Sequence, residues 1–282
     1  HSDGQQAAVM KSAATDCFNW GYDPFHFTAP EGSFATSAAD GAVRLREFRA
    51  MVQALHRAGL RVGMDMVYNH TTASGQHAKS VLDRIVPGYY QRLDDKGAVA
   101  NSTCCDNTAT EQAMMTKLMI DSAVVWARDY KVDSFRFDLM GHQPREAMER
   151  LQRAVNAATG RRIDVIGEGW NFGEVENGKR FVQAAQKSLN GSGIGSFSDR
   201  ARDAARGSSW GSAEDNVRNK GWIHGEGTAQ QADLLRVGLA GTLESFEMTD
   251  RSGARVPLSR IDYNGQPPGY ASQPGEVVNY VD

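Results

Sequence analysis

Arg136 and Asp138 lie two residues apart near the end of an alternating, β-type run, Val132–Leu139, which continues into Gly141. Residues two apart on a strand project to the same face, so we expect the guanidinium and the carboxylate to point together at the tip of a strand. A neighbouring cation keeps a carboxylate ionised, and an ionised, positioned carboxylate can act as a nucleophile. The alternative is an ion pair that only ties the strand end to its neighbours.

Two further apolar runs end in polar residues. Residues 60–67 lead into Tyr68-Asn69-His70-Thr71, and residues 162–166 lead into Gly167-Glu168-Gly169-Trp170. If all three runs are parallel strands, then His70, Asp138 and Glu168 gather at one edge of the sheet. Glu168 then supplies a second carboxyl group for acid–base work. Its alternative interpretation is an exposed carboxylate in a turn.

The order of helical and extended patterns predicts parallel strands joined by helical crossovers. Apolar spacing predicts helices over residues 45–58, 111–130, 145–158, 181–189 and 229–239, and strands over 60–67, 132–138, 162–166, 193–197 and 277–281. A (β/α)8 barrel, which places its chemistry at the carboxyl ends of the strands, fits this rhythm. A doubly wound sheet would share the rhythm, but no glycine-rich phosphate loop opens a helix.

Three segments do not follow that rhythm. The first fifteen residues show little periodicity and suggest an arm, and residues 207–228 read as irregular. Residues 72–110 form a long loop region of the kind that is usually functional, and we predict that it lies at the active site.

Composition narrows the class of protein. The 282 residues carry a net charge of −3, which argues against a nucleic-acid binder. No apolar run approaches the ~20 residues that span a bilayer, so we expect no membrane insertion. The first residues have no signal-peptide pattern, although such a peptide could have been removed or left out.

The three cysteines, Cys17, Cys104 and Cys105, form no zinc motif. The adjacent pair, Cys104 and Cys105, is either a vicinal disulfide or two free thiols.

An aromatic-rich segment, Asn19–Phe27, precedes the first predicted helix. Aromatic faces stack on sugar rings and bases, so this segment could be a ligand platform. It could equally be an apolar plug at one end of the core.

These motifs together resemble those of the α-amylase family of glycoside hydrolases. The resemblance rests on residues 65–71, 132–142 and 166–170, which occur in the family's order. Residues 19–24, residues 197–203 and the Asn264–Pro267 and Asn279–Val281 segments are similar to the branch of type I pullulanases and limit dextrinases. Adjacent cysteines in the loop before the helix at 111–130 also occur in some pullulanases, which favours the disulfide.

The resemblance implies roles for individual side chains. Asp138 would be the nucleophile, Glu168 the general acid/base, and Arg136 the group that keeps Asp138 ionised. Tyr22 and His70 would line the subsite of the sugar that is cleaved. His142 and Trp170 would flank the substrate.

The implied reaction is retaining hydrolysis of α-1,6-glucosidic branch linkages in pullulan, limit dextrins or branched glucans. Such enzymes need two carboxyl groups ~5–5.5 Å apart, one charged and one protonated, and adjacent parallel strands ~4.8 Å apart can supply them. Arg136 would keep Asp138 charged, and the setting of Glu168 beside Trp170 would favour its protonated form. An α-1,4-acting amylase or transglycosylase, or a catalytically silent glucan-binding fragment, are the alternatives.

Some positions depart from the family pattern. Ser134 and Asn171 stand where glycine and aspartate are usual, and neither change removes a catalytic group. The family's third carboxylate falls beyond Asp282, and the first strand, most of the second and the eighth are expected to be missing. We therefore expect residues 1–282 to be the central part of a catalytic barrel from a larger chain with additional domains, and to be poorly stable and nearly inactive alone.

The resemblance also implies a setting for the protein. The chemistry requires no cofactor, although Asn69 and nearby loop oxygens could contribute to a calcium site as in relatives. The expected location is extracellular or periplasmic, and the expected partner is an α-glucan polysaccharide or oligosaccharide.

Overall fold

The computed structural model describes residues 3–12, 20–207, 212–225, 227–262 and 269–280. Cys17, Asn19, Asn264–Pro267, Val281 and Asp282, which the sequence analysis singled out, lie outside these described residues.

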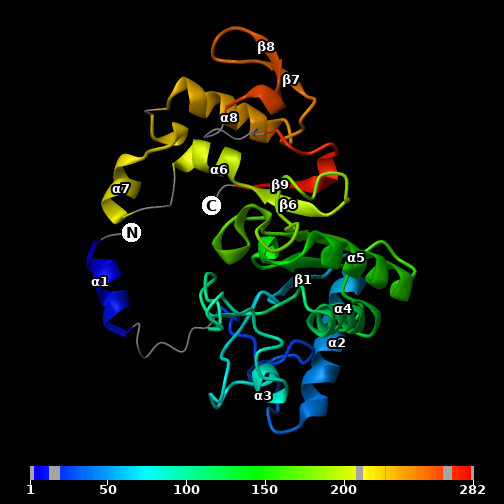
Figure 1. Ribbon diagram of the computed structural model, residues 1–282. Coiled ribbons are helices and arrows are strands. Elements are labelled where there is room, and N and C mark those ends of the chain that lie inside the picture. The colour runs from blue at the N-terminus through cyan, green and yellow to red at the C-terminus, as the bar shows by residue number, and fades with distance from the viewer. Residues whose placement is uncertain (1–2, 13–19, 208–211, 226, 263–268, 281–282) are drawn as a thin grey trace.

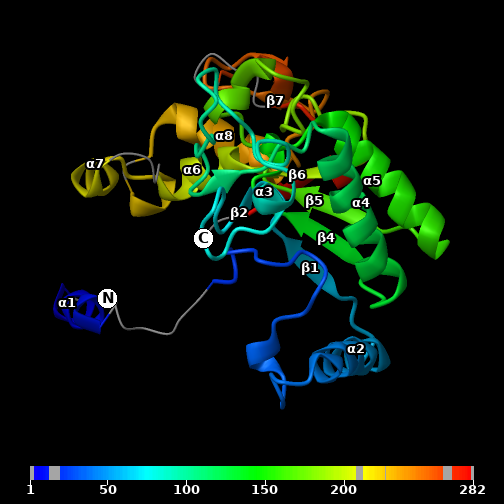
Figure 2. The same cartoon turned by 60° about the horizontal axis from the view of Figure 1, so that its bottom comes forward.

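A five-stranded parallel sheet is the centre of the fold. Its strands lie in the order β1 (Gly63–Met66), β4 (Ser134–Phe137), β5 (Asp164–Gly167), β6 (Gly195–Ser198) and β9 (Val277–Asn279). Each neighbouring pair is parallel, so all five carboxyl ends meet at one edge. The predicted parallel α/β fold is confirmed, and all five predicted strands are present with shifted ends (β1, β6 and β9 are labelled in Figure 1, β4 and β5 in Figure 2).

Helices cover the sheet and form a second cluster beyond it. Helix α4 (Ala113–Arg128) packs against α5 (Arg145–Thr159), and both lie along one face of the sheet (Figure 2). Helix α6 (Asp199–Arg206) packs against α8 (Ala229–Leu239), next to the hairpin of β7 (Glu247–Thr249) and β8 (Arg255–Pro257). The remaining described α-helices are α1 (Asp3–Ser12), α2 (Gly41–Arg57), α3 (Leu82–Ile85) and α7 (Ala213–Arg218).

The strand pattern separates a packed face from a polar face. Phe135 and Phe137 of β4 are fully buried against the helices, whereas Ser134 and Arg136 are half-buried on the opposite face. The core around these phenylalanines includes Trp126 and Met119 of α4. The alternation in β4 thus buries its phenylalanines in the core and places Arg136 on the opposite face of the sheet.

The prediction of a helix at 181–189 was wrong. In the structure this segment forms turns, because its backbone bonds to other segments: Arg145 N–H donates to Val182 O, and Ala184 N–H donates to Gln143 O. Contacts between distant segments have overridden the local apolar spacing.

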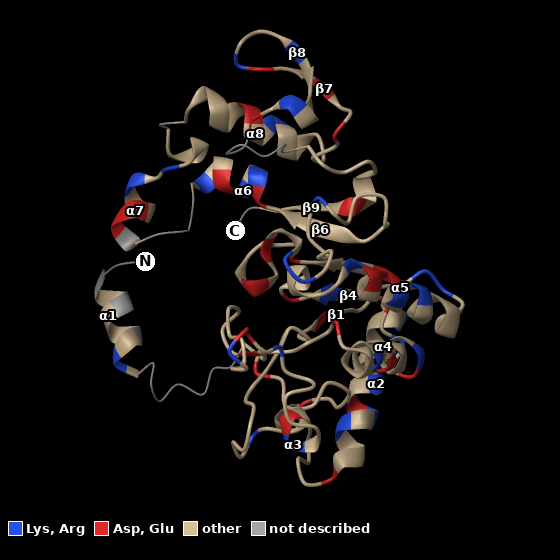
Figure 3. Cartoon of the chain, viewed as in Figure 1, with Lys and Arg blue, Asp and Glu red and all other residues tan. Residues whose placement is uncertain are grey.

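Four of the described α-helices, α1, α3, α6 and α7, were not predicted. Helix α1 lies in the segment read as an arm, and α7 lies in the region read as irregular. Helix α7 does carry a sequence signal, because Ser212 and Asp215 form a reciprocal capping box at its start. Acidic and basic residues are interspersed along α5, α6 and α7 (Figure 3), in keeping with the small net charge.

The segment 72–110 is more ordered than a loop. It contains α3, and its end, β3 (Asp106–Asn107), pairs antiparallel with β2 (His70–Thr71). Among the described residues, no helix combines the length and apolar character needed to cross a membrane.

Replacing Phe135 by alanine should lower the free energy of unfolding by about 3–5 kcal/mol, because it leaves a cavity beside β4. Chemical denaturation measures the change. Phe34→Ala removes an 89% exposed ring and is the matched control, expected within about 0.5 kcal/mol of the parent. Equal effects of the two substitutions would contradict the assigned core.

Candidate active site

The register of the sheet places the two predicted carboxylates on adjacent strand tips. Phe137 pairs with Gly167, so Asp138 and Glu168 each follow a paired position by one residue. The Asp138 N–H donates to Met66 O at 2.9 Å, and the Glu168 N–H donates to Phe137 O at 3.1 Å. Both tips are therefore held by the backbone of the neighbouring strand.

Arg136 joins these carboxylates through one guanidinium. Its Nη1 lies 3.1 Å from Asp138 Oδ1, and its Nη2 lies 2.9 Å from Glu168 Oε1. The second Glu168 oxygen accepts a hydrogen bond of 2.9 Å from the Leu139 N–H. The predicted Arg136–Asp138 pair is present, but it is part of a larger cluster.

Asp65 also belongs to this cluster, although the sequence assigned no function to it. It lies on β1 directly opposite Arg136, and its Oδ1 is 2.8 Å from Arg136 Nη1. The Tyr22 hydroxyl donates to Asp65 Oδ2 at 2.6 Å. A carboxylate inside an otherwise apolar strand was the signal that could have identified it.

The charges in the cluster compete. Burial, and then the negative charge of Glu168, raise the pKa of Asp138 to about 6, and Arg136 offsets only part of this rise. Arg136 was expected to keep Asp138 ionised; in the structure its guanidinium is shared with Glu168 and Asp65, and the pKa of Asp138 is raised rather than lowered. Burial and the bond to Asp65 raise the pKa of Tyr22 to about 12, so its hydroxyl stays protonated.

His70 lies beside this cluster and contacts Tyr22. Its Nε2 donates to the Tyr22 carbonyl oxygen at 2.7 Å, while Nδ1 lies 3.0 Å from the Asn69 side-chain nitrogen. Burial lowers the pKa of His70, which favours the neutral ring. The predicted grouping of Tyr22, His70, Arg136, Asp138 and Glu168 is thus present in the structure.

His142 is in a different environment from the one expected of a residue that flanks a substrate. It is fully buried, stacks edge-on against Phe172 with ring centroids 4.6 Å apart, and accepts from Arg92 through its carbonyl at 2.9 Å. Burial, together with the charge of Arg92, lowers the pKa of His142 to about 4. A neutral, covered ring of this kind supports the loop behind Asp138.

Arg92 was not predicted, yet it connects three loops. This fully buried side chain pairs with Glu111 at 2.8 Å and with Glu174 at 3.1 Å, besides its contact with His142. Burial alone would raise the pKa of Glu174, but hydrogen bonds from Ser102 and Asn107, with Arg92, lower it to about 2. A single arginine within a loop-like stretch carries no periodic signal that would reveal such a role.

Trp170 follows Glu168 and is half-buried. Its ring lies 5.6 Å from the guanidinium of Arg202, and its backbone fits closely against Gly141, where an added Cβ would stand 1.9 Å from the Trp170 carbonyl oxygen. The loops after β4 and β5 therefore pack directly on one another.

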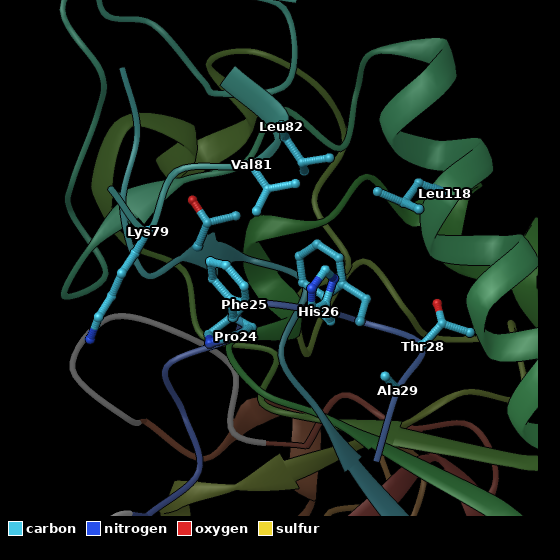
Figure 4. A pocket seen from close by; sticks show the side chains of 11 residues that line it. Pro24, Phe25, His26, Thr28, Ala29, Lys79, Val81, Leu82 and Leu118 are labelled. Atoms are coloured by element: carbon cyan, nitrogen blue, oxygen red, sulfur yellow. The ribbon is translucent and has the colours of Figure 1, made fainter. Parts of the chain in front are cut away.

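The aromatic segment is partly buried at one end and exposed at the other. Phe27 stacks on Tyr68 with centroids 5.0 Å apart and plugs the core, whereas Trp20 is 78% exposed. A cavity of about 280 Å³ opens beside this segment (Figure 4). Its lining is largely apolar and consists of Pro24, Phe25, His26, Phe27, Thr28, Ala29, Thr71, Lys79, Val81, Leu82 and Leu118.

The cysteine alternatives are resolved, since Cys104 and Cys105 form a disulfide. Within the part of the chain that the structure describes, His70, Cys104 and Cys105 are the one group of three or more acidic, histidine or cysteine side chains close enough to share an ion. Asn69 Oδ1 is buried without a partner, as a cation ligand would be.

Comparison with known proteins identifies relatives of nearly the whole chain. No family model matches it. It is 47% identical over 297 residues to a pullulanase from Klebsiella pneumoniae, with 98% of this chain and 26% of the relative covered. It is 41% identical over 302 residues to the chloroplastic pullulanase 1 of Arabidopsis thaliana, with 98% and 31% covered.

A solved structure agrees with these relatives. The crystal structure of Klebsiella pneumoniae pullulanase complexed with maltotriose superposes with a TM-score of 0.90 at 46% identity, covering 98% of this chain and 27% of that one. The chain therefore spans between a quarter and a third of the length of the relatives it matches.

Asp138→Asn should raise the free energy of unfolding at pH 7.5, on the order of 1–3 kcal/mol, because it removes a buried charge that Glu168 repels. The raised pKa means that the folded state takes up a proton on Asp138 as the pH falls through about 6. The native protein therefore regains this stability in acid, and the gain from the substitution should shrink at pH 4.5. Urea unfolding at both pH values tests this; a loss of stability at pH 7.5 would contradict it.

Proposed function

The chain is homologous to a segment of the pullulanases, in the α-amylase family, and we propose that it forms the catalytic centre of an enzyme that hydrolyses α-1,6-glucosidic branch linkages. The substrates would be pullulan, limit dextrins or branched glucans. Within that centre Asp138 is the nucleophile and Glu168 the general acid/base, and Tyr22, His70 and Arg136 surround the sugar that is cleaved.

One observation carries the proposal: a single guanidinium holds two carboxylates on adjacent parallel strand tips. Retaining hydrolysis needs two carboxyl groups ~5–5.5 Å apart, and neighbouring strands are ~4.8 Å apart. The relatives that match this chain are pullulanases, and one was crystallised with maltotriose.

The reaction would proceed in two displacements. Glu168 donates its proton to the leaving glycosidic oxygen while Asp138 attacks the anomeric carbon, so that the C–O bond breaks and a glycosyl ester forms. Glu168, now ionised, takes a proton from water, whose oxygen attacks the same carbon and releases Asp138. Arg136 orients both carboxylates, and the neutral Tyr22 ring offers a stacking face.

His142 and Trp170 would act in this proposal by shaping the substrate's surroundings. Trp170 is half-buried beside Glu168 and can flank a sugar. His142, being buried, would do so indirectly, by supporting the loop that follows Asp138.

The wider architecture is part of the same proposal. The five parallel strands would be consecutive members of a (β/α)8 barrel that lacks its first and last strands here, and residues 72–110 would be its long active-site loop region. Further domains of a longer chain, an extracellular or periplasmic location and calcium at Asn69 remain proposals, of which the last is supported by one buried amide oxygen.

Asp138→Asn and Glu168→Gln should each reduce pullulan hydrolysis by several orders of magnitude in the full-length protein, because each removes one of the two reacting carboxyl groups. Release of maltotriose from pullulan is the measurement. Glu247→Gln alters an exposed carboxylate that pairs with Arg255 rather than with Arg136, and should cost far less activity.

Amylose and pullulan digested in parallel distinguish the alternatives. Cleavage of amylose with pullulan left intact would refute the α-1,6 assignment. Binding of glucan without cleavage of either polymer would refute the catalytic roles.

The rate of pullulan hydrolysis, as kcat/KM, should fall as the pH drops below about 6. Burial and the negative charge of Glu168 raise the pKa of Asp138 to about 6, and Asp138 can attack only as a carboxylate. A pH profile between 4.5 and 8 measures this limb. A kcat/KM that stays constant across pH 6 would contradict the raised pKa of the nucleophile.

A further inference from the structure

A cluster of soft metal ligands lies next to the charged centre. Suitable ligand atoms of His70, Cys104 and Cys105 all lie within 4.8 Å of one another. Cys104 Sγ is 3.8 Å from His70 Nε2. The two sulfurs are bonded to each other, so they cannot act as thiolates in this state.

We propose that reduction of the Cys104–Cys105 disulfide creates a binding site for a thiophilic dication such as Zn²⁺ or Cd²⁺, with His70 as the third ligand.

The backbone fixes the two halves of this site. His70 on β2 pairs with Asn107 on β3, and the Thr108 N–H donates to Asn69 O at 2.9 Å. The cysteines immediately precede β3, so the same pairing that orders β3 carries them to His70. Cys104 is exposed, which leaves the disulfide accessible to a reductant.

The spacing fits tetrahedral coordination. A zinc ion with Zn–N of ~2.0 Å and Zn–S of ~2.3 Å places the nitrogen and sulfur about 3.5 Å apart. The 3.8 Å between His70 Nε2 and Cys104 Sγ differs from this by only a few tenths of an ångström. Two unbonded sulfurs on the same ion stand about 3.8 Å apart, close to the separation of two thiols in van der Waals contact.

The surroundings favour a positive ion. Asp23 and Asp106 both act electrostatically on the His70 ring. Ligation through Nε2 leaves the ring proton on Nδ1, and the Asn69 amide beside it can orient the ring by turning its buried, unpartnered Oδ1 to accept from the Nδ1–H. Nε2 would exchange its bond to the Tyr22 carbonyl for the ion, and water or that carbonyl would complete the coordination.

The chemical step is a balanced thiol–disulfide exchange. A dithiol reductant supplies two electrons and two protons, the Sγ–Sγ bond breaks, two thiols form, and the reductant becomes a disulfide. Binding of the dication then releases the thiol protons to solvent. The site would thus exist only in the reduced protein.

Co²⁺ is the probe, because tetrahedral cobalt–thiolate complexes absorb strongly in the near ultraviolet and the visible. The full-length protein is reduced with dithiothreitol, freed of reductant without oxygen, and titrated with CoCl₂. We expect one high-affinity Co²⁺ per chain with thiolate charge-transfer and intense visible bands, displaced by Zn²⁺. The oxidised protein should show neither band. Reduced protein without these bands at stoichiometric Co²⁺ would overturn the proposal.

Variants assign the ligands. Cys104→Ser, Cys105→Ser and His70→Gln should each weaken Co²⁺ binding by more than the ~10–100-fold typical of an outer-sphere partner. Cys17→Ser and the exposed His77→Gln are the matched controls and should bind as the parent does. Parent-like binding by His70→Gln, or its loss in Cys17→Ser, would overturn the assignment. Cys104→Ser changes an exposed side chain, so it keeps the test decisive if His70→Gln does not fold.

This test does not depend on catalysis. Absorption reports the ion whether or not pullulan is cleaved, so a failure of the proposed function and a failure of the metal site are separate results.

Discussion

The charge balance around Arg136 is the constraint on which the rest of the candidate site depends. One guanidinium, 23% exposed, pairs with Asp65, Asp138 and Glu168, which come from three adjacent strands. Without that cation, three carboxylates at one sheet edge would repel each other at a cost that a partly buried site cannot support. One guanidinium does not offset three carboxylates, and the pKa of Asp138 is raised as a result. A centre that holds a proton near neutrality is what acid–base chemistry requires.

The sheet supplies the precision that this balance needs. Phe135 and Phe137 fix β4 against the helices, and the period of two along the strand then determines where Arg136 points. A slip of one residue would bury the arginine and expose both phenylalanines, so the core specifies the register of the site. The four residues of β4, Ser134–Phe137, therefore serve both purposes: two pack against the core on one face of the sheet, and Arg136 reaches the carboxylates on the other.

The sequence was informative where local patterns and strand ends determine the structure. Alternation and helical spacing predicted the five strands and the principal helices, and the polar strand tips predicted the meeting of Asp138 and Glu168. The sequence was not informative where contacts between distant segments determine the local structure. Residues 181–189 form backbone hydrogen bonds to residues 143–145 instead of a helix. Arg92 has its role because Glu111, His142 and Glu174 contact it from separate loops. The burial of His142 follows from the same convergence.

The segment 72–110 shows why such convergence matters for the chemistry. Its pairing with β2 brings the disulfide to His70, and Arg92 within it reaches the loops that follow β4 and β5. The buried charges of Arg92 and Glu174 are tolerable only when all their partners are in place, so the three loops must order together. The backbone after β4 carries Leu139 in a left-handed conformation, φ 39°, and its N–H is the donor to Glu168. A strained residue of this kind persists only where its surroundings over-determine it. The His142 N–H donates to Leu139 O, and the His142 carbonyl accepts from Arg92, so the Arg92 network is connected through His142 to the residue whose N–H orients Glu168.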